Sequence, residues 1–290
     1  MGCPRALQPA GLNKSFTILA LVFLCRLAGL AAEPLPLSVA GLHNAYRVTD
    51  RIFSGSQPEG DSAFAGLARL GVKTIVSVDG AKPDVAAARK YGIRTIHLPF
   101  GYDGVPAARI AELTRAVNLQ PGALYVHCHH GKHRGPAAVA IMCEASEGWD
   151  AERAVGWMRK AGTADDYPGL YRAAREFRPA TKAQMEQAGE LPEVAKTPAL
   201  VDVMVALDAR LDALKAAASA DAAQQTTLLW EQLRELARSE DAAARPADYI
   251  AKLGDAEKAA AALRRSVSEG TIRALSESCA ACHKGYRNRK

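Results

Sequence analysis

The stretch ALYVHCHHGKHRGP, residues 123–136, decides how this 290-residue chain folds. A β-rich run ends on Cys128, a short loop leads to Arg134, and Pro136 opens a helical pattern. This order of strand, loop and helix N-terminus directs several backbone N–H groups into one concavity, and the positive end of the helix dipole adds to their field. The stretch therefore predicts a site for a tetrahedral oxyanion.

Three side chains of the loop predict nucleophilic chemistry on a phosphate group. Cys128 lies at the base of the concavity, where the field of the amides favours a thiolate nucleophile. Arg134 can hold two phosphate oxygens with its planar guanidinium, and Gly131 permits the tight backbone. The other loop positions that we expect to bind substrate are His129, His130, Lys132, His133 and Gly135.

The spacing resembles the HCxxGxxR loop of the cysteine-dependent protein tyrosine and dual-specificity phosphatases. All four fixed positions match, as His127, Cys128, Gly131 and Arg134. The resemblance extends upstream through RVTDRIFSGSQPEGDSAFAGLARLGVKTIVSVDG, residues 47–80, which looks like the opening of the bacterial dual-specificity-like phosphatases. It implies an α/β phosphatase fold and the hydrolysis of phosphate monoesters through a phosphocysteine intermediate.

The same resemblance implies a general acid and shows one departure. In HLPFGYDGVP, residues 97–106, Asp103 stands at the place of the carboxyl group that protonates the leaving oxygen in the family. The family usually has Ser or Thr directly after the loop arginine, where the hydroxyl assists breakdown of the phosphocysteine, and this chain has Gly135. The departure implies slow turnover, or a substitute such as His130 or His133.

The loop histidines and a second cysteine have other interpretations. Four histidines lie between His127 and His133, so a metal site is an alternative; no Asp or Glu joins them, and positive charge on an anion-binding loop is the simpler interpretation. Cys143 on the following helix is either a buried small hydrophobic residue or a resolving thiol. A catalytically weak, phosphate-binding member of the family is the alternative to an active phosphatase.

Short β-rich runs alternate with helical segments around this loop, which predicts an α/β layer structure over residues 40–178. The expected strands are 46–48, 52–54, 73–78, 94–98 and 123–128. The expected helices are 59–70, 83–91, 105–118, 136–147, 151–161 and 168–177.

Beyond the α/β region the character of the chain changes. Residues 179–197 are polar and proline-bearing, which predicts a linker. Residues 198–290 lose the strand signals and carry leucine and alanine at helical spacing, with helices expected near 198–217, 222–240, 246–265 and 269–288. Four long helices with short connections favour an all-α, antiparallel four-helix bundle.

The last of these helices carries the motif Cys279-Ala-Ala-Cys282-His283. CxxCH is the attachment site of c-type haem, where two thioethers hold the porphyrin and the histidine binds the iron. Its continuation, CAACHKGYR, closely resembles the C-terminal motif of class II cytochromes of the c-prime and c556 type, which implies one covalent haem c. A disulfide between Cys279 and Cys282, or a zinc pair that lacks partners, is the alternative.

A methionine on the first of the four helices is a candidate sixth ligand to the iron. In an up-down-up-down bundle the start of the first helix lies at the same end as the finish of the fourth, so Met204 can approach a haem held at residues 279–283. In c556-type relatives a methionine near this place ligates iron, whereas c-prime types leave the position open. The alternative is a core methionine.

Composition and the N-terminus exclude some functions and predict a location. With 49% hydrophobic and 23% charged residues the chain is globular, and a net charge of +6 without a basic block does not require nucleic acid. Residues 1–32 combine a basic start, an apolar run and small residues, which predicts a cleaved export signal, a periplasmic protein and no stable membrane span. An uncleaved anchor and lipidation at Cys25 are the weaker alternatives.

Taken together, the motifs predict an exported cysteine phosphatase joined to a monohaem cytochrome. Its substrate is then a phosphorylated protein or small molecule, and a redox partner protein is expected for the haem. The rival function is an electron-transfer or redox-sensing cytochrome whose phosphatase-like domain binds phosphate without turning it over.

Overall fold

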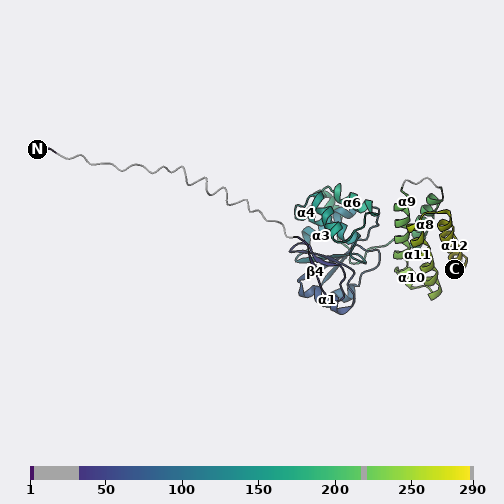
Figure 1. Ribbon diagram of the computed structural model, residues 1–290. Coiled ribbons are helices and arrows are strands. Elements are labelled where there is room, and N and C mark those ends of the chain that lie inside the picture. Colours follow the sequence, from purple (N-terminus) through teal and green to yellow (C-terminus); the bar gives the residue numbers. More distant parts are fainter. Residues whose placement is uncertain (3–32, 217–220, 288–290) are drawn as a thin grey trace. The chain divides into compact units, whose positions relative to one another are not determined.

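The computed structural model describes residues 1–2, 33–216 and 221–287 (Figure 1). Apart from the first two residues, the export signal predicted for residues 1–32 lies outside this described part. By its contacts, the chain from Pro34 onward belongs to one compact unit. Among the helices of the described residues, none is long and apolar enough to cross a membrane.

A six-stranded sheet with the order β1-β2-β3-β6-β4-β5 forms the centre of the N-terminal region. β3, β6, β4 and β5 are parallel, whereas β1 and β2 pair antiparallel at one edge. The strands are β1 (Leu35–Leu37), β2 (Ala45–Arg47), β3 (Ile52–Gly55), β4 (Val72–Ser77), β5 (Arg94–His97) and β6 (Ala123–His127). β6 lies between β3 and β4, so its backbone is bonded on both sides and its carboxyl end is fixed.

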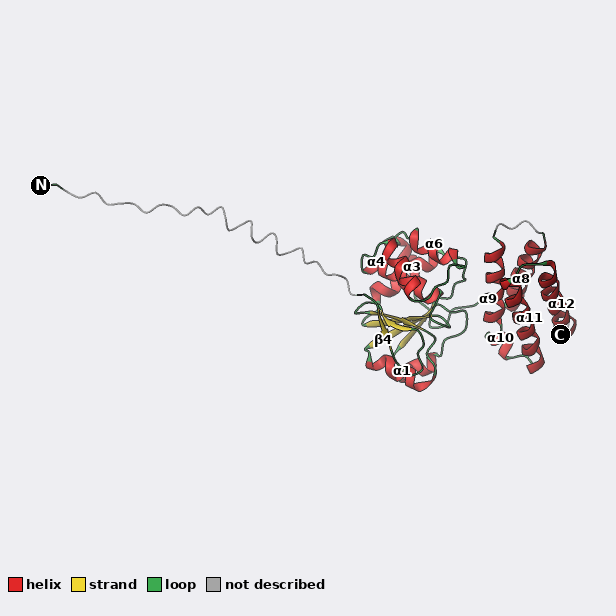
Figure 2. Cartoon of the chain, viewed as in Figure 1, coloured by secondary structure: helices red, strands yellow, loops and turns green. Residues whose placement is uncertain are grey.

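Helices cover both faces of this sheet (Figure 2). α1 (Gly60–Arg69) and α2 (Val85–Lys90) contribute to an apolar core on one face. The core of the other face is built by α3 (Ala107–Leu119), α4 (Arg134–Ser146), α5 (Ala151–Lys160) and α6 (Pro168–Arg175). The predicted α/β fold of a sheet flanked by helices is therefore confirmed for this region.

The segment predicted as a linker is partly attached to the α/β region. It contains α7 (Lys182–Gln187), which begins with a capping box between Thr181 and Gln184. Leu191 is buried in the core around α4, and the carbonyl of Pro192 accepts a 2.8 Å hydrogen bond from the backbone N–H of His97 in β5. The buried leucine and several hydrogen bonds, among them the one to the edge strand β5, hold the segment, and a polar composition does not reveal these contacts.

The C-terminal helical region comprises α8 (Leu200–Lys215), α9 (Ala222–Leu236), the short α10 (Glu240–Ala243), α11 (Ala247–Arg265) and α12 (Glu269–Tyr286). α8 and α11 each contact both α9 and α12. The four long helices share one apolar core, in which leucines predominate. α9 ends earlier than the predicted residue 240, because Ser239 caps α10 with its side chain.

Candidate active site

The loop of residues 127–134, called the phosphate loop below, joins β6 to α4 at the carboxyl edge of the parallel strands. Cys128 directly follows β6 and is 4% exposed. Gly131 has a φ of +69°, and a Cβ at this position would overlap the backbone of Gly55, so the loop requires glycine here. Nδ2 of Asn44 donates to the carbonyl of Gly131 at 2.9 Å. The backbone of β3 and a side chain before β2 therefore keep the loop tight.

Arg134 begins α4, and its side chain is fully buried. Nη2 donates to Oδ2 of Asp79 at 2.9 Å, and Nη1 donates to the carbonyl of Phe100 at 3.1 Å. The ring of Tyr102 faces the guanidinium, whose carbon lies 4.2 Å from the ring centroid. Burial opposes the charge, but Glu235, Tyr102 and Asp79 raise the pKa of Arg134 well above its usual value. The structure thus fixes a permanent cation beside the loop.

Asp79 joins this arginine to the loop, although the sequence analysis did not single it out. It follows β4, and its side chain is 1% exposed. Oδ2 accepts hydrogen bonds from Arg134 and from the backbone N–H of His129, each at 2.9 Å, and Oδ1 accepts one from Arg238 at 2.8 Å. Burial acts to raise the pKa of Asp79, but Arg134 and Arg238 hold it well below its usual range. The sequence feature that could have identified Asp79 is a single carboxylate shortly after the buried strand β4.

The loop histidines do not carry the positive charge expected of them. Burial lowers the pKa to about 4 in three of them, His127, His129 and His133. Burial and the nearby Arg234 also lower the pKa of His130. Imidazoles with a pKa of about 4 are neutral near pH 7, so the buried positive charge of the loop comes from Arg134, and the exposed Lys132 adds a second cation. Within the described ranges, no three His, Cys, Asp or Glu side chains are grouped so that they could hold a metal ion.

Lys132 and Gly135 contribute differently to the loop. The side chain of Lys132 is exposed, and its carbonyl accepts a 2.7 Å hydrogen bond from Oγ1 of Thr163. A Cβ at Gly135 would lie 3.2 Å from the backbone nitrogen of Cys128 and 3.5 Å from its Sγ. Position 135 is therefore next to the nucleophile, where a hydroxyl group would reach a phosphocysteine, and glycine offers none.

Asp103 is an exposed residue in the loop between β5 and α3. It lines a cavity of about 550 Å³ together with Tyr102, Arg109 and Glu235. A Cβ at Gly169 would overlap the backbone of Asp103, so α6 packs closely against this loop. The structure places Asp103 in the lining of the same cavity as Tyr102, whose ring covers Arg134.

Cys143 lies in the middle of α4 with 0% exposure. Burial, with Glu147 adding to it, raises the pKa of this thiol well above its usual value. A protonated thiol packed in the core is a poor nucleophile, so the structure favours the small hydrophobic residue over the resolving thiol.

The CxxCH motif lies near the end of α12. Cys282 is buried in the core of the helical region, and Cys279 packs against that core. Both are free thiols, and burial raises the pKa of each. Met204 on α8 is partly buried against the same core, and His283 follows Cys282 with a half-buried side chain. Met204 and Cys279 therefore pack against the core in which Cys282 is buried.

A buried thiol, a buried arginine and a tight loop at the carboxyl edge of the parallel strands of a mixed sheet define a phosphatase-like α/β domain. No family model matches the chain. Over 125 residues, or 42% of the chain, it is 30% identical to a Pseudomonas aeruginosa protein named dual specificity protein phosphatase TpbA. The match covers 56% of that relative, so the chain spans about half the length of the curated relatives it matches.

Solved structures of phosphatases align with about half of the chain. The crystal structure of P. aeruginosa TpbA covers 56% of this chain and 99% of its own, at 23% identity and a TM-score of 0.45. Human DUSP28 covers 50% of this chain and 97% of its own, at 22% identity and a TM-score of 0.37.

Proposed function

We propose that this protein hydrolyses phosphate monoesters through a phosphocysteine formed on Cys128. The observation that carries the proposal is the phosphate loop, where the thiol directly after β6 and the buried guanidinium of Arg134 at the start of α4 are joined by one tight loop. The identity of 30% to a dual specificity phosphatase over 125 residues supports the same chemistry.

In the first step the thiolate of Cys128 attacks phosphorus, and the bond between phosphorus and the leaving oxygen breaks. The electron pair of that bond stays on the leaving oxygen, which takes the proton of the Asp103 carboxyl group. Arg134 and the loop amides hold the three non-bridging oxygens throughout, because their geometry is fixed before the substrate arrives.

In the second step a water molecule attacks the phosphocysteine. The Asp103 carboxylate takes the proton of the water, the bond between sulfur and phosphorus breaks, and inorganic phosphate leaves as the thiolate returns. Since Gly135 offers no hydroxyl to assist the departure of sulfur, we expect this step to limit turnover.

Aromatic side chains favour an aryl phosphate as the substrate. The rings of His133 and Tyr167 have centroids 4.1 Å apart, those of Tyr102 and Tyr167 lie 5.4 Å apart, and Tyr102 also covers Arg134. Such a cluster beside the loop can pack against the ring of a phosphotyrosine or a small aryl phosphate. The predicted export signal implies that the reaction takes place in the periplasm.

The test is hydrolysis of p-nitrophenyl phosphate by Cys128→Ser, with Cys143→Ser as the matched control. We expect Cys128→Ser to lose activity by at least roughly 10³-fold, because the covalent intermediate requires sulfur, while Cys143→Ser keeps it. Acid quench of the wild type with radiolabelled phosphotyrosine should trap phosphate on the chain, and Cys128→Ser should trap none. Wild-type turnover by Cys128→Ser would show that another mechanism operates.

We propose a second function for the helical region, which is to carry one covalent haem c as a four-helix bundle of the class II cytochrome type. The described residues fit this group. Cys279 and Cys282 are unpaired thiols at the CxxCH spacing, and His283 follows them. The hydroxyl of Tyr249, which interacts electrostatically with Cys282, is buried and has no hydrogen-bond partner among the described residues.

In this proposal Cys279 and Cys282 would hold the porphyrin by thioethers, and His283 would bind the iron. When bound, the haem supplies a one-electron redox centre, which implies a redox partner protein. Met204 is the candidate sixth ligand. The rival proposal, a redox cytochrome with a catalytically weak phosphatase-like domain, rests on Gly135 and predicts a haem without measurable phosphate release.

Expression in a haem-maturing periplasm tests this second function. The wild type should show haem staining after denaturing electrophoresis, and the double change Cys279→Ser/Cys282→Ser should abolish it, with Cys143→Ser as the control. Met204→Ala should keep the covalent haem and convert the ferric iron from low spin to high spin. An unstained wild type would exclude covalent haem under these conditions of maturation.

A further inference from the structure

One face of α9 is polar and does not contribute to the core of the helical region. Its residues follow the spacing i, i+4, i+7, i+8 and i+11, which places them in one stripe along α9 and the turn after it. This polar stripe consists of Thr227, Glu231, Arg234, Glu235 and Arg238. The opposite face carries leucines that pack into the core, so α9 has two different contact surfaces.

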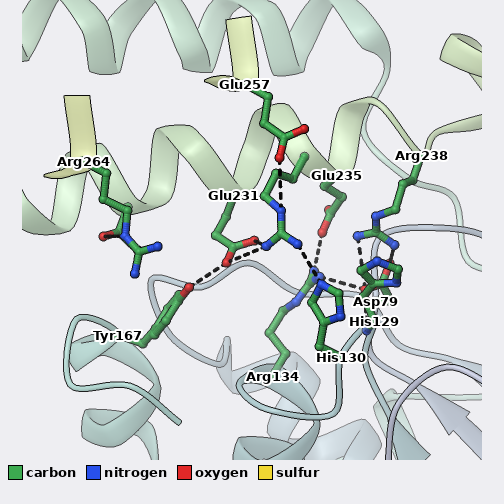
Figure 3. Close-up of polar contacts among 12 residues, drawn as sticks. Asp79, His129, His130, Arg134, Tyr167, Glu231, Glu235, Arg238, Glu257 and Arg264 are labelled. Carbon is green, nitrogen blue, oxygen red and sulfur yellow. Dashed lines mark hydrogen bonds and ion pairs between the residues drawn. The ribbon is translucent and has the colours of Figure 1, made fainter. Parts of the chain in front are cut away.

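The polar stripe contacts residues in and around the phosphate loop (Figure 3). Oε1 of Glu231 accepts a 2.6 Å hydrogen bond from the hydroxyl of Tyr167. Nη2 of Arg234 lies 2.7 Å from Nε2 of His130, and since a guanidinium only donates, the histidine nitrogen accepts.

Further along the stripe, Arg238 donates to Asp79 at 2.8 Å. At the other end of the polar stripe, Oγ1 of Thr227 donates to Oδ2 of Asp166 at 3.2 Å. The alternating charges of α9 therefore meet complementary groups on both sides of the loop.

The central contact of the polar stripe occupies Arg134, the arginine that would bind a substrate phosphate. Oε2 of Glu235 lies 2.5 Å from Nη1 of Arg134, while Asp79 occupies Nη2. A carboxylate and a phosphate monoester are both anions that the arginine fork binds through two nitrogens. A phosphate that binds Arg134 through Nη1 must displace Glu235 from that nitrogen.

The surroundings of Glu235 are shaped for this contact. A Cβ at Gly80 would overlap the carboxylate of Glu235, so the absence of a side chain at position 80 leaves the room that the carboxylate fills. With α9 in this place, the side chain of Arg134 is 0% exposed and Cys128 is 4% exposed. The side chain of Glu235 is 33% exposed, so it lies nearer to solvent than the arginine it covers.

We propose that the polar stripe of α9 is an intramolecular inhibitor that holds Glu235 on Arg134 in the place of a substrate phosphate. The inference rests on the proposed phosphatase activity. Substrate binds only the fraction of molecules in which Glu235 has left Arg134, so the apparent affinity for phosphate falls by that fraction. One charge-assisted hydrogen bond corresponds to roughly a tenfold to hundredfold effect on such an equilibrium.

The test compares full-length wild type with Glu235→Ala, using Glu277→Ala as the matched control because Glu277 is exposed on α12. Two quantities are measured: kcat/KM for p-nitrophenyl phosphate, and the Kd of inorganic phosphate by calorimetry in the Cys128→Ser background. We expect Glu235→Ala to raise kcat/KM and to lower the Kd, each by roughly tenfold or more, and Glu277→Ala to change neither. If Glu235→Ala fails to fold, Glu235→Gln keeps the volume and removes the charge.

The two measurements separate this inference from the proposed function. If wild type and variant hydrolyse the ester equally and bind phosphate equally, α9 is no inhibitor and the phosphatase proposal stands. A lower kcat/KM with weaker phosphate binding in the variant also overturns the inference. If neither protein hydrolyses the ester but the variant binds phosphate more tightly, the competition by Glu235 is supported and the phosphatase activity is not.

Discussion

The two cysteine motifs of this chain are both short, yet the structure completes them in different ways. Around Cys128 the charge comes from separate segments, with Asp79 after β4 and Glu235 on α9 both bound to Arg134. Around Cys282, the other cysteine of the motif, Cys279, and the histidine, His283, lie on the same helix α12. The surroundings of Cys282 are an apolar core. The phosphate loop therefore depends on residues far away in the sequence, whereas the CxxCH motif carries its main groups within one helix.

If the site of Cys128 is assembled from distant segments, the largest effect should come from Asp103, which lies on another loop. Asp103→Asn removes the proton donor, so kcat on an alkyl phosphate should fall by roughly 10²–10⁴. The loss on p-nitrophenyl phosphate should be much smaller, because that leaving group departs without a proton. Steady-state kinetics on both esters test this, with the exposed Asp50→Asn as the control; equal losses on both would assign Asp103 a positional role.

A second change at a distance concerns Asp79, which is a positioning residue rather than a group that contacts substrate. Asp79→Asn removes the buried counter-charge of Arg134 and leaves only the partly exposed carboxylate of Glu235 beside it, so the free energy of unfolding should fall by up to about 3–5 kcal/mol. Asp61→Asn, in an exposed ion pair with Lys90, should cost less than about 1 kcal/mol.

Chemical denaturation measures both changes at Asp79 and Asp61. The phosphate Kd of Asp79→Asn in the Cys128→Ser background then reports whether Arg134 has lost its orientation. Equal stability of the two variants would show that the buried network around Asp79 contributes little, and the contrast between the two motifs would weaken.

A change within the loop should have a smaller effect and the opposite sign. Gly135→Ser places a hydroxyl near Sγ of Cys128, where one hydrogen bond in the breakdown step should raise kcat by roughly fivefold to tenfold. Gly156→Ser on α5, where a Cβ has nothing within 4 Å, is the matched control and should leave kcat unchanged. Pre-steady-state kinetics should show a smaller burst in Gly135→Ser; an unchanged kcat with an unchanged burst would mean that breakdown is not limiting.

The last effect concerns pH, because burial keeps the ring of His127 neutral near pH 7. Burial lowers the pKa of His127 to about 4, below the value near 6.5 that an unfolded chain has. Between these two pH values the unfolded state binds a proton that the folded state does not. As the pH falls through this range, His127 should therefore lower the free energy of unfolding by up to about 1.4 kcal/mol per pH unit. Stability from this source is fully present above pH 6.5 and declines toward pH 4.

Urea denaturation at several pH values measures this decline. His127→Gln should reduce the slope of stability against pH, because the variant has no ring to protonate at this position. His43→Gln removes an exposed histidine outside the loop and serves as the control. An unchanged slope in His127→Gln would assign the acid sensitivity to other groups.

The sequence by itself determined what lies close together along the chain. The alternation of strand and helix signals gave the sheet and its flanking helices, since periodicity reports which face of an element is buried. The spacing of Cys128, Gly131 and Arg134 identified the phosphate loop, because a tight loop between a strand and a helix brings these three residues together. The helical spacing after residue 198 identified the long helices, and Leu191 and α7 were missed because a polar segment with one buried leucine has no period.

Only the tertiary structure decided the electrostatics of the phosphate loop. Asp79 and Glu235 are 55 and 101 residues from Arg134, and no local pattern shows that their carboxylates converge on one guanidinium. The histidines illustrate the same limit, since the sequence shows ionisable rings and the packing around them determines that they stay neutral. Charge in a folded protein depends on burial and on neighbours in space, and both are properties of the fold rather than of the local sequence.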